Sequence, residues 1–224
     1  MLPPLLRLLA AAPMAVLLGC GSAAAASSAD ATVPEPMSDA PSIAIGTQTA
    51  VFAGGCFWGV DAVFRHVKGV TGVVSGYAGG TRQTAMYEEV GTGTTGHAEA
   101  VEVTYDPAVV SYGTLLKVFF TIAHDPTQLN RQGPDVGSHY RSAIFFANDA
   151  QRTAAVAYIA ELGKARVFRQ PIVTSLEPLH GFFAAEAYHQ DYLAQHPDQP
   201  YIVLNDLPKL ELLKRRLPEL FTGN

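Results

Sequence analysis

The stretch "GGCFWGVDAVF" (residues 54–64) places a cysteine directly after two glycines and directly before two aromatic residues. The apolar segment that leads into it, "TAVFAGG" (49–55), is typical of a short strand that ends in a turn. Beyond the cysteine, apolar residues recur at helical spacing, at Phe57, Val60, Phe64 and Val67. The pattern predicts a strand, a glycine turn and an amphipathic helix that begins beside Cys56.

Strands and helices interleave along the rest of the chain. In "HAEAVEVTYDP" (97–107), alternation places Val101, Val103 and Tyr105 on one face of a strand. The other assignments are helix caps at Ser111 and Asn148, a loop over 124–140 and a helix over 184–196. This order of elements indicates an α+β fold, in which helices cover a sheet.

The composition is that of a globular protein. The chain has 224 residues, of which 48% are hydrophobic and 16% charged, so it can bury a core. Its net charge of −5 argues against nucleic-acid binding, which needs a basic face. Two cysteines, Cys20 and Cys56, cannot form a disulfide framework, and no CxxC pair supports a structural zinc site.

The first 20 residues, "MLPPLLRLLAAAPMAVLLGC", are typical of a signal peptide. Arg7 and the amino terminus supply positive charge ahead of a Leu, Ala and Val run that Pro13 interrupts. The ending "LLGC" is similar to a bacterial lipoprotein signal, so we expect Cys20 to be lipidated and the protein to be anchored to a cell-envelope membrane. The alternatives are ordinary cleavage in the alanine run 23–26, which gives a soluble periplasmic protein, and retention of the segment.

Three parts are therefore expected: a signal peptide over 1–20, a flexible tether over 21–45 and one folded domain over 46–224. The tether is inferred from its small, polar, proline-containing sequence. Whether Cys20 is lipidated or removed, Cys56 becomes the only free thiol of the mature chain.

Two motifs resemble known sites but lack the surroundings those sites need. "GTGTTG" (91–96) fits a dinucleotide-binding fingerprint, which should open a helix, whereas an alternating strand follows it here. "HAE" (97–99) fits half of a zinc deaminase signature, but the second, cysteine-containing half is missing. The first is better explained as a turn, and neither predicts a cofactor or a metal.

Cys56 has surroundings that suit a reactive thiol. A lone cysteine is usually a small buried apolar residue. Here the neighbouring glycines allow a ligand to approach the backbone, and a helix N-terminus favours a thiolate. Phe57 and Trp58 are adjacent, so they point about 100° apart on a helix and cannot share one buried face. One of them is expected to line a pocket.

The stretch "GCFWG" (55–59) resembles the signature of the A-type peptide-methionine (S)-S-oxide reductases. The resemblance continues, in order, through "GYAGG" (76–80), "TGHAE" (95–99), "YDP" (105–107), "HDPT" (124–127), "RQGPDVGSHYRSAIF" (131–145) and "YHQDYL" (188–193). It covers the whole domain, which it implies is a methionine sulfoxide reductase catalytic domain. The implied fold is an α+β two-layer sandwich with a central mixed β-sheet, flanking helices and a ferredoxin-like core.

The resemblance implies a protein-repair enzyme that reduces methionine-S-sulfoxide, free or in peptides and proteins. Cys56 would attack the sulfoxide sulfur and end as a sulfenic acid. Glu99 would be the general acid that protonates the sulfoxide oxygen, and burial would have to raise its pKa for that task.

The resemblance also implies roles for other residues. Tyr87 and Tyr140 would hydrogen-bond the sulfoxide oxygen, Asp135 would order the polar side of the site, and Phe57 and Trp58 would hold the substrate methyl group. Three neighbours are interpreted as structural: His189, Gln190 and Tyr192.

One feature departs from many members of that family. Residues 57–224 contain no cysteine, so no second thiol of the mature chain can form a disulfide with Cys56. We therefore expect the single-catalytic-cysteine form, a monomer without bound cofactor, whose sulfenic acid is reduced by an external thioredoxin-like protein or small thiol. A cysteine hydrolase and a binding module for methionine side chains are the rival hypotheses.

Overall fold

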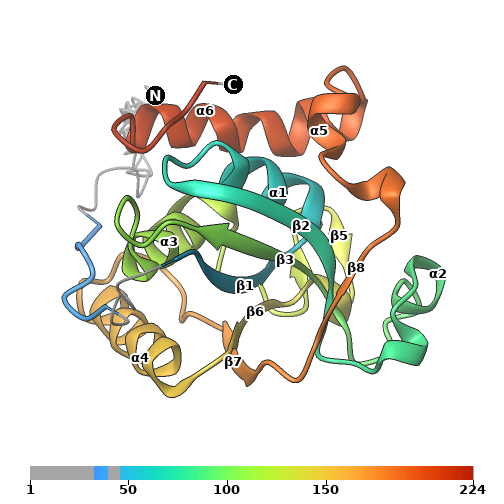
Figure 1. The fold of residues 1–224 in the computed structure, drawn as a ribbon, viewed down its shortest axis with the longest axis horizontal. Coiled ribbons are helices and arrows are strands. Elements are labelled where there is room, and N and C mark those ends of the chain that lie inside the picture. Colours follow the sequence, from blue (N-terminus) through green and yellow to red (C-terminus); the bar gives the residue numbers. More distant parts are fainter. Residues whose placement is uncertain (1–32, 40–45, 224) are drawn as a thin grey trace, which may run out of the picture.

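A six-stranded mixed sheet lies at the centre of the computed structural model, which describes residues 33–39 and 46–223 (Figure 1). Across the sheet the strands are β7 (Ser175–Pro178), β6 (Ser142–Phe146), β1 (Gln48–Gly54), β3 (Ala98–Tyr105), β2 (Val70–Ala78) and β8 (Phe182–Ala184). Neighbouring strands are antiparallel except β6 and β7, which are parallel. The predicted mixed sheet is confirmed.

The inner four strands have ferredoxin-like connectivity. The chain runs β1, α1 (Phe57–Arg65), β2, β3, α3 (Tyr112–Val118) and β6, and these strands lie in the order β6-β1-β3-β2. This is the split βαβ arrangement repeated about the sheet. The predicted α+β fold with a ferredoxin-like core is therefore confirmed, and α1 leaves the sheet from the end of a central strand.

The main core lies between the sheet and the helices on one of its faces. Phe52 of β1 and Val101 and Val103 of β3 are buried there, together with Val60 and Phe64 of α1. The opposite face carries a smaller cluster built mostly of alanines, packed against residues near 179 and 182. Alternation along β1 and β3 separates the two faces, as the sequence pattern predicted.

The remaining elements surround this centre. They are η2 (Arg82–Thr84), α2 (Tyr87–Val90), the π-helical turn η3 (Phe119–Ala123), β4 (Arg131–Gln132), β5 (Asp135–Val136), η4 (Ser138–Tyr140), α4 (Asp149–Lys164), η5 (Ala187–His189), α5 (Tyr192–Gln195), the π-helical turn η6 (Ile202–Asp206) and α6 (Leu207–Arg216). Both predicted caps are present, because the Thr114 N–H donates to Ser111 Oγ (3.1 Å) and the Gln151 N–H donates to Asn148 Oδ1 (2.9 Å).

Two local predictions were wrong in part. Residues 184–196 do not form one helix, because Asp191 has a φ of +49° and separates η5 from α5. The Gln190 amide bonds to the backbone of Ser75 on β2, which holds this segment against the sheet. Residues 124–140 contain a short β4-β5 hairpin rather than loop alone.

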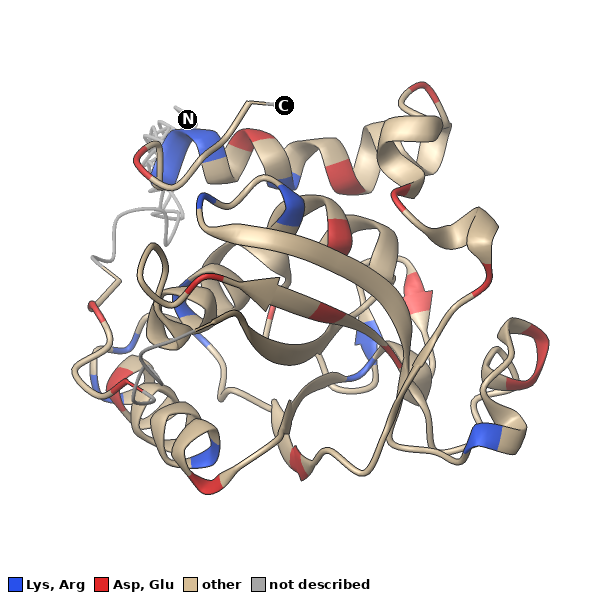
Figure 2. Cartoon of the chain, viewed as in Figure 1, with Lys and Arg blue, Asp and Glu red and all other residues tan. Residues whose placement is uncertain are grey.

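Charged groups follow the helix ends. Figure 2 shows the basic run at the C-terminal end of α6, which consists of Lys214, Arg215 and Arg216. Positive side chains at this end complement the helix dipole.

Within the described residues, every helix is too short or too polar to span a bilayer.

Residues 33–39, part of the predicted tether, have defined contacts with the domain. The Tyr158 hydroxyl of α4 donates to the Pro34 carbonyl (3.0 Å), and the Gly113 N–H of α3 donates to Asp39 (2.8 Å). The predicted signal peptide, Cys20 and the rest of the tether as far as residue 32, together with residues 40–45, lie outside the described residues.

Candidate active site

Cys56 lies in the turn between β1 and α1, with a glycine directly before it and another in the first turn of α1. Gly55 has a φ of +90°, and a Cβ there would stand 2.4 Å from the Gln132 side chain. A Cβ on Gly59, one turn into α1, would stand 2.0 Å from Asp206. Because both positions exclude a side chain, "GCFWG" allows α1 to start close to its neighbours with Cys56 buried at its first turn.

Glu99 reaches the same turn from β3. Its carboxyl is buried, and Oε2 accepts a hydrogen bond from the Phe57 N–H at 3.0 Å. Burial raises the pKa of Glu99 to about 8, nearby Asp135 adds to the rise, and the bond from Phe57 opposes it. Near neutral pH, Glu99 is therefore mostly a neutral acid directly beside Cys56.

The protonation state of Cys56 differs from the prediction. Burial raises the pKa of the thiol well above its usual value, and negative charge on Glu99 or Asp206, when these groups are ionised, raises it further. The Trp58 N–H at the helix start lowers it, as expected for a helix N-terminus, but desolvation is the larger effect. The resting group is thus a thiol rather than the expected thiolate.

Tyr87 and Tyr140 approach from two different elements. Tyr87 begins α2, and its N–H donates to Glu186 at 2.9 Å, whereas Tyr140 ends η4. Burial raises the pKa of both phenols, and negative charge on Glu99 or Cys56, when either is ionised, raises it further. The structure therefore brings these two predicted residues together with Cys56 and Glu99, as neutral hydroxyl donors.

Asp135 contributes through a tyrosine that the sequence analysis missed. The Tyr201 hydroxyl donates to Asp135 Oδ2 in a short hydrogen bond. Burial raises the pKa of Tyr201, and negative charge on Cys56, when the thiol is ionised, raises it further. Because the two groups affect each other, this phenol belongs to the site. Tyr201 follows "HPDQP" (196–200) and lies beyond the motif "YHQDYL" (188–193), so no local signal marks it.

Phe57 and Trp58 form the aromatic wall of the site. Phe57 is buried, whereas Trp58 is partly exposed and is held from the C-terminal segment. The Trp58 Nε1–H donates to His189 Nδ1 at 3.1 Å, and Tyr192 stacks on the indole with ring centroids 3.8 Å apart. His189 and Tyr192, interpreted from sequence as structural, thus orient the aromatic wall.

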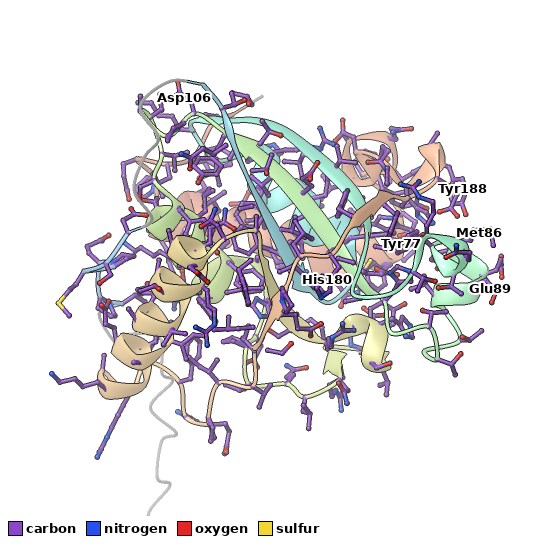
Figure 3. All side chains as sticks on the ribbon, turned by 60° about the horizontal axis from the view of Figure 1, so that its bottom comes forward. Tyr77, Met86, Glu89, Asp106, His180 and Tyr188 are labelled. Atoms are coloured by element: carbon purple, nitrogen blue, oxygen red, sulfur yellow. The ribbon has the colours of Figure 1, made fainter. Side chains whose placement is uncertain are left out.

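The exposed rim of the site lies near α2. Met86 and Tyr188 are 51% and 57% exposed, and each directly neighbours a site residue in the chain. Figure 3 shows both with Glu89 at the outer edge of the molecule, while Tyr77 lies further in.

His124 and His189 are both hydrogen-bonded to groups other than Cys56, so neither forms the pair that a cysteine hydrolase would need. His124 lies against Gly54, but its ring nitrogens bond to the Phe119 carbonyl (2.9 Å) and to Ser142 Oγ (2.7 Å). His189 is bonded to Trp58. In the part of the chain that the structure describes, no group of three or more His, Cys, Asp or Glu side chains could hold a metal ion.

Comparisons with known proteins agree on one family. The model of the family described as peptide methionine sulfoxide reductase matches residues 48–219. A peptide methionine sulfoxide reductase of Mesorhizobium japonicum is 58% identical over 177 residues, which cover 79% of this chain and 91% of that protein. The corresponding protein of a Synechocystis strain is 49% identical over 187 residues, covering 82% and 87%.

Solved structures give the same result. Methionine sulfoxide reductase A of Corynebacterium diphtheriae superposes with a TM-score of 0.59 at 38% identity, over 68% of this chain and 76% of that one. Reduced Mxr1 of Saccharomyces cerevisiae gives a TM-score of 0.58 at 34% identity, over 68% and 87%. The chain belongs to the peptide methionine sulfoxide reductase family, whose members are oxidoreductases that return methionine sulfoxide to methionine.

Proposed function

We propose that Cys56 is the nucleophile and Glu99 the general acid in the reduction of methionine-S-sulfoxide, free or within peptides and proteins. The observation that carries the proposal is the buried Glu99 carboxyl, which is bonded to the N–H of the residue directly after Cys56. No other described carboxyl is bonded to the backbone of that turn. A neutral acid beside a thiol suits a substrate whose oxygen must be protonated before it leaves sulfur.

The first half-reaction oxidises Cys56 and reduces the sulfoxide. Cys56 Sγ bonds to the electrophilic sulfoxide sulfur while Glu99 donates its proton to the sulfoxide oxygen. The resulting Glu99 carboxylate then lies beside the thiol and can accept the Cys56 proton. Glu99, now reprotonated, protonates the oxygen a second time, so the S–O bond breaks and water leaves. A water molecule then attacks Sγ and breaks the bond between Sγ and the substrate sulfur, while Glu99 takes up the released proton. The net change is thiol plus sulfoxide to sulfenic acid plus methionine, with the sulfur of Cys56 oxidised and that of the substrate reduced.

The tyrosines and the aromatic wall would contact different parts of the substrate. Tyr87 and Tyr140 are neutral hydroxyls that can donate to the oxygen as negative charge develops on it. Phe57 and Trp58 offer apolar surface for the methyl group. With the oxygen and the methyl group held on different sides, one epimer at sulfur fits, and we assign the S form.

The second half-reaction needs an external thiol. Because Cys20 and Cys56 are the only cysteines, the domain has no second thiol of its own. A donor thiol attacks the sulfenic acid and releases water, and a second donor thiol attacks the mixed disulfide and restores Cys56. A thioredoxin-like dithiol supplies both thiols from one molecule, whereas a small thiol must act twice.

We further propose that the protein is exported as a monomer and anchored at the cell envelope through lipidated Cys20. The signal-like sequence over 1–20 supports this placement. The mass of the mature protein tests it: a thioether-linked lipid on Cys20 is expected, and an unmodified Cys20 thiol, or a chain that starts after residue 20, would remove the anchor.

The catalytic proposal is tested by turnover of a methionine-S-sulfoxide peptide with dithiothreitol. Cys56→Ser should abolish turnover, since a hydroxyl cannot form the sulfenic acid. Wild-type protein given substrate without reductant should gain the mass of one oxygen atom at Cys56. Equal turnover by Cys56→Ser, or equal rates on the R and S epimers, would contradict the proposal.

A further inference from the structure

A buried ion pair lies beneath the first turn of α1 and has no part in the mechanism above. Asp206, at the junction of η6 and α6, is completely buried, and Lys209 follows it on α6. Lys209 Nζ lies 3.1 Å from Asp206 Oδ1, and the lysine side chain is only 18% exposed. Two opposite charges are therefore largely removed from water at one place.

This ion pair is in direct contact with the helix that carries Cys56. A Cβ on Gly59 would stand 2.0 Å from Asp206 Oδ1 and 2.5 Å from Lys209 Nζ. Gly59 lies three residues after Cys56, so the pair faces the first turn of α1. The second glycine of "GCFWG" thus admits the two charged groups, and any larger residue would displace them.

The Asp206–Lys209 ion pair is not expected to add much to the stability of the fold. Asp206 Oδ2 is buried and has no hydrogen-bond partner among the described residues. Leaving a buried carboxylate oxygen unpaired costs free energy, and a buried ion pair often contributes no more stability than apolar residues of the same size. The position of the pair against α1 therefore points to an electrostatic role.

We propose that Asp206 and Lys209 set the charge environment of Cys56, with Lys209 stabilising the negative charge that develops on Sγ and Asp206 holding the ammonium against α1. Both are positioning residues, since they act through Cys56. The proposal deepens the proposed function and rests on it for the role of Cys56. The positive charge of Lys209 lowers the pKa of the Cys56 thiol, against the larger effect of burial.

Other titratable groups also face this part of the molecule. They are Glu99 on β3, Asp135 on β5, His124 after η3, and the phenols of Tyr87, Tyr140 and Tyr201. After burial and Glu99, Asp206 raises the pKa of Cys56 and Lys209 lowers it. The two partners of one ion pair thus shift the pKa of the thiol in opposite directions. Removing one charge and then the other should therefore change the reactivity of Cys56 in opposite directions.

The test measures alkylation of Cys56 by iodoacetamide in the full-length protein, with mass spectrometry reading only the peptide that contains Cys56. Asp206→Asn keeps an Oδ1 acceptor for the Lys209 ammonium but removes the negative charge, so it should speed alkylation about threefold at fixed pH for each unit by which the thiol pKa falls. Adding Lys209→Met to Asp206→Asn should reverse that gain. Lys214→Met, an exposed change on the same helix, is the matched control and should leave the rate unchanged.

A purely structural role would move both variants in the same direction or neither. Unchanged alkylation in Asp206→Asn, or a further increase on adding Lys209→Met, overturns the proposal. If circular dichroism shows that Asp206→Asn does not fold, Lys209→Met alone decides above pH 8: slower alkylation supports the proposal, and an unchanged rate overturns it. Alkylation needs no sulfoxide, so failure here leaves the proposed function standing, whereas failure of that function shows only in turnover.

Discussion

The two sides of Cys56 are built in different ways. On one side, Glu99 comes from β3 and Phe57 from α1, and a hydrogen bond joins the two residues. On the other, His189, Tyr201 and Asp206 come from the C-terminal segment and reach the site through contacts more than 60 residues apart in the chain. The first side carries the groups that would react, and the second side holds them in place.

This difference predicts how substitutions act. Changes at Glu99 or at the site tyrosines should lower kcat, because those groups meet charge that develops in the reaction. Changes in the C-terminal segment should act on substrate binding or on the reactivity of Cys56, because those groups only position others. Substitutions on each side of Cys56 test this difference.

Glu99→Gln should give the largest loss, a fall in kcat of about 100-fold or more, because an amide cannot supply the proton. Glu102→Gln, on the same strand and partly exposed, is the control and should retain wild-type turnover. Steady-state kinetics with a sulfoxide peptide measure both. Comparable turnover in the two variants would show that Glu99 is not the general acid.

Tyr140→Phe should lower kcat about 10-fold through the loss of one hydrogen bond to the sulfoxide oxygen. The KM should change less, because the bond strengthens as the oxygen gains charge. Tyr188→Phe removes an exposed hydroxyl from the rim and should leave kcat unchanged. A rise in KM at constant kcat would instead place Tyr140 among the positioning residues.

His189→Phe should raise KM about fivefold, because Trp58 loses its hydrogen bond while the reacting groups stay in place. Trp58 is the only tryptophan of the chain, so intrinsic fluorescence reports directly on the aromatic wall. The emission should shift in this variant but not in His180→Phe, which changes an exposed histidine. An unshifted emission would show that His189 does not orient Trp58.

A further effect is expected on stability as a function of pH. Burial raises the pKa of Glu99 from its ordinary 4.5 to about 8, so the folded protein binds this proton more tightly than the unfolded chain. The stabilisation is complete below about pH 4.5 and is lost as pH rises through about 8. The Tm of wild type should therefore fall relative to that of Glu99→Gln across this range. A constant difference in Tm would mean that Glu99 is not held neutral.

Much of the first side could be predicted from sequence. Alternation and helical spacing give β1, α1 and β3, and hydrogen-bonding side chains mark the caps at Ser111 and Asn148. Glu99, Tyr87, Tyr140 and Asp135 were named through the resemblance to a family, and the structure brings them to Cys56. Short-range patterns suffice where the local chain decides the conformation.

The second side could not be predicted in the same way. Tyr201 and Lys209 have no local signal, because their roles depend on tertiary contacts with Asp135 and Gly59. The helix expected over 184–196 is interrupted because Gln190 bonds to β2 instead. The thiol state of Cys56 was missed because helix-end electrostatics can be inferred from sequence, whereas the degree of burial cannot.

The hydrogen bond from the Phe57 N–H to Glu99 also determines which carboxyl oxygen carries the proton. An N–H can only donate, so Oε2 is committed as an acceptor and the carboxyl hydrogen belongs on Oε1. The proton to be delivered therefore sits on the oxygen that the backbone leaves free. Once it departs, the negative charge remains on a group already bonded to an amide at the start of a helix, where anions are stabilised. One hydrogen bond thus selects the oxygen that acts and favours the ion that it leaves behind.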